Sequence, residues 1–277
     1  MNYSSRFWLF APIALLLAVA ATAMARWYTV AGAVEKKLDA ANGHEIAPGI
    51  TLSFAGKKVS GFPFNIDVVF EKLAVEGQGA HGPFRWTSEN FALHRLTYGR
   101  DQGIYEAAGK QTLNWTDAGG RSHGLNFLPA MLHASTVADA KGLVRFDLEA
   151  VNAGGQDSAG VAFTAADTQV HFRRDPKADA VDLQLSGSEI KAGGNIAGLF
   201  GDHISRISVY ATLSKGSAFA PLLAGTGSWA DASADWRAKE GQAVMGPVEI
   251  KSTGLNLNAT AFADTGGDLA AVFDPLY

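Results

Sequence analysis

Seven histidines and scattered acidic residues are the side chains of this 277-residue chain that could bind a metal or transfer a proton. No two histidines have the HxH or HxxxH spacing that would turn both imidazoles toward one metal ion. The sequence contains no GxSxG motif, and its carboxylates show no catalytic pairing. Cysteine is absent, which excludes disulfides and thiolate chemistry. We therefore predict no catalytic residue, no metal site and no cofactor, and we expect a protein that is not an enzyme.

One glycine-rich stretch, Gly77 to Gly82, has the GxGxxG form of a dinucleotide-binding motif. Such a site needs a helix that begins within the motif and receives the phosphates at its N-terminus. Pro83 comes next instead, and Phe84 and Trp86 alternate as they would in a strand. We therefore interpret this stretch as a hairpin turn.

The elements that must position any site begin with an uncharged apolar run from Phe7 to Ala25. As a helix rising about 1.5 Å per residue it would span roughly 28 Å, close to the roughly 30 Å of a bilayer's hydrocarbon core. Trp8 at one end, and Trp27 and Tyr28 at the other, are predicted membrane-interface residues because aromatic rings collect at both interfaces. The run therefore predicts a membrane helix.

A cleaved signal peptide is the alternative, since Ala21-Thr22-Ala23 and Ala23-Met24-Ala25 both have the small-x-small form of a cleavage site. Against cleavage, a helical pattern continues beyond the run, with apolar residues every four positions from Val30 to Leu38. We favour residues 1–26 as an uncleaved anchor and residues 27–48 as a juxtamembrane helix and linker. The positive charges at the two ends slightly favour the opposite orientation, but a signal-like N-terminus normally exports the chain behind it.

Strict alternation of apolar and polar residues dominates residues 49–277. The period of two is typical of half-buried strands, and glycine and proline turns separate most of the runs. We predict a mainly β domain, an antiparallel meander that forms a curved sheet or a sandwich. Two sub-halves that meet near residues 190–215 are an open alternative. Short helices are expected at Leu128–Ala140, at Asn195–His203 and around Trp229–Lys239.

The longest alternating run places five apolar residues on one strand face, and a strand of a closed core would look the same. The functional interpretation is an open, curved sheet whose hollow face holds an acyl chain or another apolar ligand. The candidate groove residues are Phe62, Phe64, Ile66, Val68 and Phe70. The formal net charge is −4 without a basic patch, which argues against nucleic acid as a partner.

Several segments of the chain resemble the bacterial family known as domain of unknown function 2125. The segments are Arg26-Trp27-Tyr28 after the apolar N-terminus, Val59-Ser60-Gly61-Phe62-Pro63-Phe64, Leu199 to Ile207, and Asp235-Trp236-Arg237. The resemblance implies an alphaproteobacterial envelope protein, and it transfers no catalytic residue. It also implies a longer C-terminus than this chain, which stops at Tyr277.

Together these observations predict a single-pass inner-membrane protein with most of the chain in the periplasm. By analogy of fold, the family is similar to large envelope proteins that handle lipid in long β-grooves. The first hypothesis is therefore a protein that binds a lipid or another apolar ligand, with the membrane as its partner. The second is a structural envelope protein with a closed core that binds another envelope protein, and a hydrolase is the third.

Overall fold

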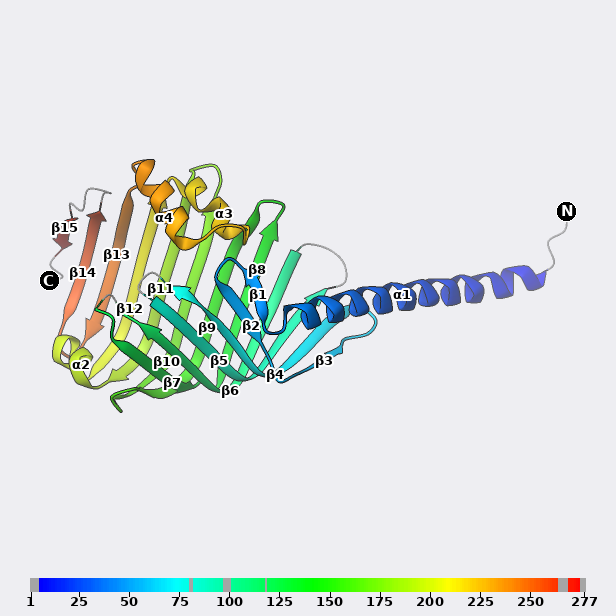
Figure 1. The fold of residues 1–277 in the computed structure, drawn as a ribbon, viewed down its shortest axis with the longest axis horizontal. Helices are drawn as coiled ribbons and strands as arrows, with labels where there is room; N and C mark the ends of the chain where they lie inside the picture. The colour runs from blue at the N-terminus through cyan, green and yellow to red at the C-terminus, as the bar shows by residue number, and fades with distance from the viewer. Residues whose placement is uncertain (1–4, 80–81, 97–100, 118, 264–268, 275–277) are drawn as a thin grey trace.

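The structure, a computed structural model, describes residues 5–79, 82–96, 101–117, 119–263 and 269–274. A long helix, α1 (Ser5–Ala41), precedes one sheet of fifteen strands (Figure 1). The strands are β1 (His44–Ala47), β2 (Ile50–Ser53), β3 (Gly56–Ser60), β4 (Asn65–Gly79), β5 (Gly82–Leu96), β6 (Asp101–Thr116), β7 (Ser122–Leu128), β8 (Met131–Asp139), β9 (Gly142–Asp157), β10 (Ala162–Asp175), β11 (Ala180–Ala192), β12 (His203–Ser214), β13 (Ala243–Ser252), β14 (Asn256–Ala263) and β15 (Leu269–Asp274). The shorter helices are α2 (Gly194–Phe200), a 3₁₀ turn (Gly216–Phe219), α3 (Ala220–Leu223) and α4 (Trp229–Ala238).

Neighbouring strands in the sheet are antiparallel and mostly consecutive in sequence, in the order β1-β2-β4-β5-β6-β7-β9, continuing through β10 to β15. Two places depart from a simple meander. β3 pairs with β4 beside β2, and β8 pairs with β6 and β9 beside β7. β7 and β8 therefore lie one after the other in the same position of the sheet, between β6 and β9. Pro129 and Ala130 separate them, because proline has no backbone N–H to donate to a neighbouring strand. The predicted mainly antiparallel β fold is confirmed.

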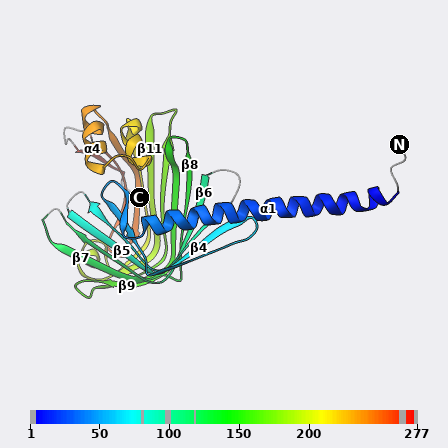
Figure 2. The same cartoon turned by 45° about the vertical axis from the view of Figure 1, so that its right-hand side comes forward.

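The sheet curls around a hollow side, and the C-terminal half of α1 and the helices α3 and α4 lie there (Figures 1 and 2). Breaks in the strand register accompany the curl, for example between Ser88 and Asn90 on β5 and between Met245 and Val248 on β13. Such bulges bend a strand and increase its twist. Within the described residues no second sheet covers the hollow side, so the fold is the curved sheet and not the sandwich.

α1 is one continuous helix that joins the predicted anchor to the predicted juxtamembrane helix. Its N-terminal part projects away from the sheet, and from Phe10 onward the helix is long and apolar enough to cross a membrane (Figure 1). It ends where Gly43 adopts a positive φ of 76°, a left-handed conformation that glycine takes without strain. Nearby, Asn42 fixes the helix end through its side chain, which bonds the backbone N–H and C=O of Phe54.

The helix predicted at Leu128–Ala140 is wrong, because this segment forms the strand β8. The spacing of Met131, Leu132 and Ala134 behind a proline imitates one face of a helix. Pairing on both sides, with β6 and β9, supplies backbone hydrogen bonds that the local pattern does not reveal.

The helices predicted near residues 195–203 and 229–239 correspond to α2 and α4. α4 begins at a Ser228 cap, whose hydroxyl accepts from the backbone N–H of Asp231. The division of the domain near residues 190–215 stays a prediction, although β11 and β12 pair from Ala180 to Lys191 across this region.

Candidate apolar groove

The hollow side of the sheet carries apolar side chains in rows that cross the strands. One such row can be read directly from the strand register, residue opposite residue, from β4 to β13. It consists of Val68, Leu93, Tyr105, Ala134, Leu148, Val170, Leu185, Val209 and Val248. Because side chains alternate between faces, one register places all of these on the same face.

Helices cover this face at its two ends and leave the middle open. At one end, Ala31 of α1 is buried against the β4 residues Ile66, Val68 and Phe70. At the other end, Ala232 of α4 is buried together with Phe219 and Val181, and these pack against Phe172 and Leu213 of the sheet. Between the two covers lies a groove of about 560 Å³, a size within the roughly 300–1,000 Å³ of small-molecule sites.

The groove is formed by strands β5 to β10, and none of its lining side chains is charged. The lining residues are Trp86, Phe91, Tyr105, Ala107, Leu125, Phe127, Leu132, Ala134, Thr136, Phe146, Leu148, Ala150, Ala153, Phe163 and Thr168. The hydroxyl groups of Tyr105 and Thr136 lie 3.2 Å apart and hydrogen-bond to each other, so these polar groups are partnered.

A chain of aromatic contacts fixes the wall of the groove nearest α1. The ring centroids of Trp86 and Phe91 lie 5.6 Å apart in an edge-to-face arrangement, and Phe91 lies 6.0 Å from Tyr105. Phe91 also contacts Phe70 at 6.2 Å, which links the groove to the core beneath α1. The edge-to-face arrangement of Trp86 and Phe91 is one that aromatic pairs prefer.

Alanines make the groove hollow. Ala107, Ala134, Ala150 and Ala153 line its floor, where a closed β core would carry larger side chains. Ala107, Ala150 and Ala153 are buried, and the larger side chains of Trp86, Phe91, Phe127 and Leu148 pack against them. The groove lining therefore combines small residues with large aromatic and aliphatic ones.

Apolar surface continues beyond the groove toward β13. Leu185 of β11 is 42% exposed on the same row, and Leu183 and Met245 on the next row are also exposed. Large apolar side chains exposed together on one face mark interaction sites in soluble domains.

The opposite face of the sheet is polar and carries histidine–carboxylate pairs between strands. Asp67 on β4 lies 2.8 Å from the Nδ1 atom of His94 on β5, and Asp147 on β9 lies 2.8 Å from the Nδ1 atom of His171 on β10. Each of these two histidines therefore pairs with a carboxylate on a neighbouring strand. Within the described part of the chain, no cluster of three or more such side chains could hold a metal ion.

Comparison of the sequence with known protein families identifies the family of this chain. The family model described as "uncharacterized protein conserved in bacteria (DUF2125)" matches residues 27–269. The chain belongs to this family. No curated protein and no solved structure matches the chain.

The five groove residues predicted from the sequence of this DUF2125 member do not line the groove. Ile66, Val68 and Phe70 lie on the predicted face, but α1 covers them and they form its packing surface. Phe62 and Phe64 precede β4 and are 50% and 59% exposed. Alternation identified the correct face, yet it could not indicate which part of that face a distant helix covers.

The DUF2125 segments Arg26-Trp27-Tyr28 and Gly61-Phe62-Pro63-Phe64 lie against each other in the structure. The indole N–H of Trp27 donates to the backbone oxygen of Asn65 at 2.7 Å, and the rings of Trp27 and Phe62 are 5.6 Å apart. The third predicted interface residue, Trp8, has a side chain outside the described part of the structure.

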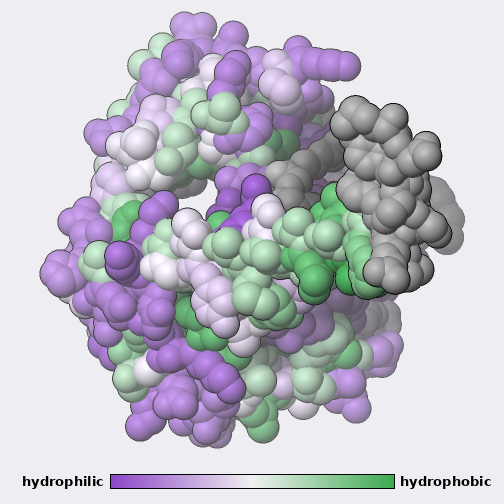
Figure 3. All heavy atoms as spheres, turned by 90° about the vertical axis from the view of Figure 1, so that its right-hand side faces the viewer, coloured by the Kyte–Doolittle hydropathy of each residue, from purple (hydrophilic) through white to green (hydrophobic). Residues whose placement is uncertain are grey.

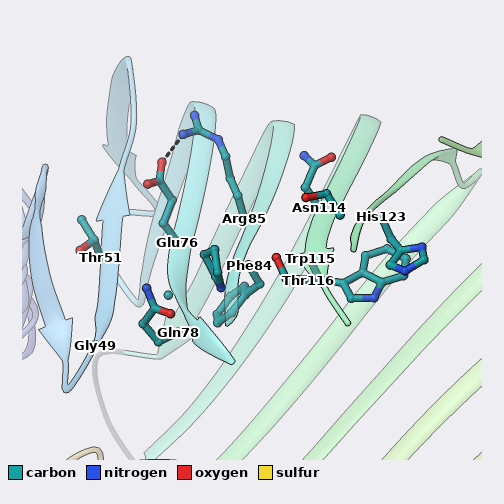
Figure 4. Close-up of a pocket in the computed structure, with 13 residues that line it drawn as sticks. Gly49, Thr51, Glu76, Gln78, Phe84, Arg85, Asn114, Trp115, Thr116 and His123 are labelled. Atoms are coloured by element: carbon teal, nitrogen blue, oxygen red, sulfur yellow. Dashed lines mark hydrogen bonds and ion pairs between the residues drawn. The ribbon is translucent and has the colours of Figure 1, made fainter. Parts of the chain in front are cut away.

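A second hollow of about 470 Å³ lies at the ends of β4 to β7 and is more polar (Figure 4). Glu76 and Arg85 form an ion pair at its rim, and Trp115 stacks on His123 with ring centroids 5.4 Å apart. A hydrogen bond from His123 and backbone N–H groups of the adjacent turn hold the pKa of Asp117 well below its usual range. The Glu76–Arg85 pair joins β4 to β5, and the contacts of Trp115, His123 and Asp117 belong to the β6–β7 hairpin.

The GxGxxG stretch of this DUF2125 member lies in the β4–β5 hairpin, as interpreted from the sequence. The two strands pair up to Gly79 and Gly82. Ala80 and His81, between them, lie outside the described residues.

Proposed function

We propose that this protein is anchored by α1 in the inner membrane, with the sheet in the periplasm, and that the groove binds the acyl chain of a lipid. The observation that carries the proposal is the uncharged, alanine-floored groove on the hollow side of the sheet. Its chemistry suits a ligand that is apolar along its length.

The free energy available to such a ligand is sufficient for binding. Each buried methylene contributes about 0.8 kcal/mol. Burial of about ten methylenes would therefore contribute about 8 kcal/mol, which corresponds to a dissociation constant near 1 μM before ordering costs are subtracted. An affinity in that range would allow the lipid to exchange between the groove and the membrane.

The anchor supports a lipid ligand because it keeps the groove close to a source. α1 runs without interruption from its exposed apolar part to Leu38, which packs against the sheet. With α1 as the anchor, this continuous helix would hold the groove near the membrane surface, without a flexible linker between them.

The test replaces a small residue that lines the groove with a large one. Ala134 lies in the middle of the apolar row, opposite Tyr105 and Leu148. The Ala134→Phe variant of the full chain should retain less lipid per protein after purification in mild detergent, as measured by mass spectrometry of an organic extract. Ala92→Phe is the matched control, since Ala92 pairs with Val69 and Glu106 on the opposite face.

Because the wild type and both variants contain α1, any lipid bound to α1 contributes equally to each sample and cancels in the comparison. Equal lipid in the wild type and in both variants would contradict acyl-chain binding in the groove. A stable membrane partner that co-purifies with the protein would then favour the structural, partner-binding alternative.

A further inference from the structure

Four aromatic residues gather where the apolar part of α1 meets the sheet. Trp27 and Tyr28 lie on the helix, and Phe62 and Phe64 belong to the turn before β4. Phe62 lies 5.6 Å from Trp27 and 6.4 Å from Tyr28, measured between ring centroids. We call these four residues the aromatic collar.

The turn that carries the two phenylalanines is held firmly. Gly61 has a positive φ of 99°, and a Cβ atom there would come within 2.7 Å of the backbone oxygen of Asn65. The backbone N–H of Asn65 donates to the backbone oxygen of Gly61 at 2.9 Å, while the backbone oxygen of Asn65 accepts from Trp27. The turn is therefore fixed to itself and to the helix, so Phe62 and Phe64 are presented in a defined place.

Three of the four collar rings are largely exposed, while Trp27 is partly buried against the core beneath α1. Tyr28 is 64% exposed, and Phe62 and Phe64 are at least half exposed. A core role would bury these rings, as it buries Phe70 in the same region. Figure 3 views the molecule from the side toward which α1 projects, and it shows apolar and polar residues together beside an opening.

The position of the collar along α1 determines what would cover it. Trp27 and Tyr28 come two and three positions after Ala25, the last residue of the uncharged run. At about 1.5 Å per residue, that is roughly 3–5 Å along the helix axis. The interfacial layer on each side of the hydrocarbon core is about 5–8 Å thick, so the collar falls within this layer. Aromatic residues are enriched at that depth.

One basic residue of β3 is paired with α1 and does not face the solvent. The Lys57 ammonium lies 2.5 Å from Asp39 and 3.8 Å from Glu35 on α1, and its side chain is only 12% exposed. This lysine ties β3 to the helix, and its charge is neutralised within the protein.

We propose that the turn from Gly61 to Phe64 inserts Phe62 and Phe64 into the interfacial layer of the membrane that α1 spans. The sheet then rests on the bilayer with its hollow side held next to the lipid. This inference rests on the membrane anchoring in the proposed function, and it does not depend on whether the groove holds lipid.

Because the chain contains no cysteine, single cysteines can report depth in the full-length protein. Phe64→Cys reports the turn, Val19→Cys reports α1, and Leu199→Cys on α2 is an exposed apolar control away from the collar. Each variant is labelled with a nitroxide in phosphatidylcholine vesicles. Relaxation by oxygen, which concentrates in lipid, is compared with relaxation by a polar nickel chelate, which stays in water.

We expect oxygen to relax the labels at Phe64 and Val19 more strongly than the nickel chelate does, and the order to reverse at Leu199. If the label at Phe64 behaves like that at Leu199 while Val19 remains in lipid, the docking inference is wrong and the anchor stands. If the Val19 label is also in water, the anchor and the docking fail together. Far-UV circular dichroism matching that of the wild type ensures that each labelled variant is folded.

Discussion

At the scale of single residues, the structure separates side chains that share one sequence pattern. Phe64 and Phe70 both belong to the alternating run before and within β4, with even spacing. Phe70 is buried with its ring 5.1 Å from that of Phe54, whereas Phe64 is largely exposed. The difference arises because α1 covers one of them.

Truncation of these two phenylalanines should therefore have unequal effects. Phe70→Ala removes a buried ring from the core beneath α1, and we expect the free energy of unfolding to fall by about 3–5 kcal/mol. Phe64→Ala is the matched control and should change it by no more than about 0.5 kcal/mol, because surface substitutions have small effects. Urea unfolding of the full chain in mild detergent, monitored by circular dichroism, measures both. Similar losses for the two variants would contradict the described packing.

The same residues indicate how far sequence reasoning can reach. A period of two predicted the apolar face, because alternation is a property of the strand itself. It could not identify the groove, whose signal is the set of alanines at positions 107, 134, 150 and 153, since alanine is common in helices, strands and turns alike. The register of β6, β8 and β9 brings these positions to one part of the sheet, where Leu132 pairs with both Ala107 and Ala150.

At the scale of elements, the hairpin between β8 and β9 is tied to β10 by one arginine. Arg174 donates to the Asp139 carboxylate at 2.6 Å and to the backbone oxygen of Lys141 at 3.1 Å. Its side chain is mostly buried, so the ion pair closes one end of the strands that form the groove. The hydrogen bond from Arg174 lowers the pKa of Asp139 below its ordinary value.

This pair predicts a pH dependence with a definite sign. A carboxyl group whose pKa is lower in the folded state stabilises the fold above its unfolded pKa, about 4, and loses that effect as the pH falls through the folded pKa. The stability difference between the wild type and Asp139→Asn should therefore be largest at pH 7 and shrink below about pH 4. Urea unfolding at a series of pH values measures this difference.

Asp235→Asn on α4 is the control, since Asp235 forms only an exposed i,i+4 pair with Lys239 and should matter little at any pH. If the stability difference between wild type and Asp139→Asn were constant from pH 7 to pH 3, ionisation of Asp139 would not link the hairpin to β10.

Element prediction failed where tertiary pairing overrode a local pattern. β8 has apolar residues at helical spacing after Pro129, so the sequence predicted a helix there. α4 was predicted correctly: it is not a strand of the sheet, and Ser228 caps its first turn. The contrast shows that isolated helices can be identified from local signals, whereas a strand that fits between two others depends on those neighbours.

At the scale of the whole molecule, one amphipathic sheet accounts for the arrangement of all the described parts. Its polar face carries cross-strand ion pairs, and its apolar face is covered by α1 at one end and by α3 and α4 at the other. The sequence predicted the long helix and the antiparallel sheet. It could not predict that α1 packs on the sheet, because that contact joins residues far apart in the chain.

Lipid binding in the groove is tested by finding where a lipid touches the protein. The full chain in membrane vesicles is irradiated with phosphatidylcholine that carries a photoreactive group in its acyl chain, and cross-linked peptides are mapped. We predict cross-links in the groove strands, around Leu132, Ala134 and Leu148, that the Ala134→Phe variant reduces. Cross-links confined to α1, with none in β6, β8 or β9, would contradict lipid binding in the groove.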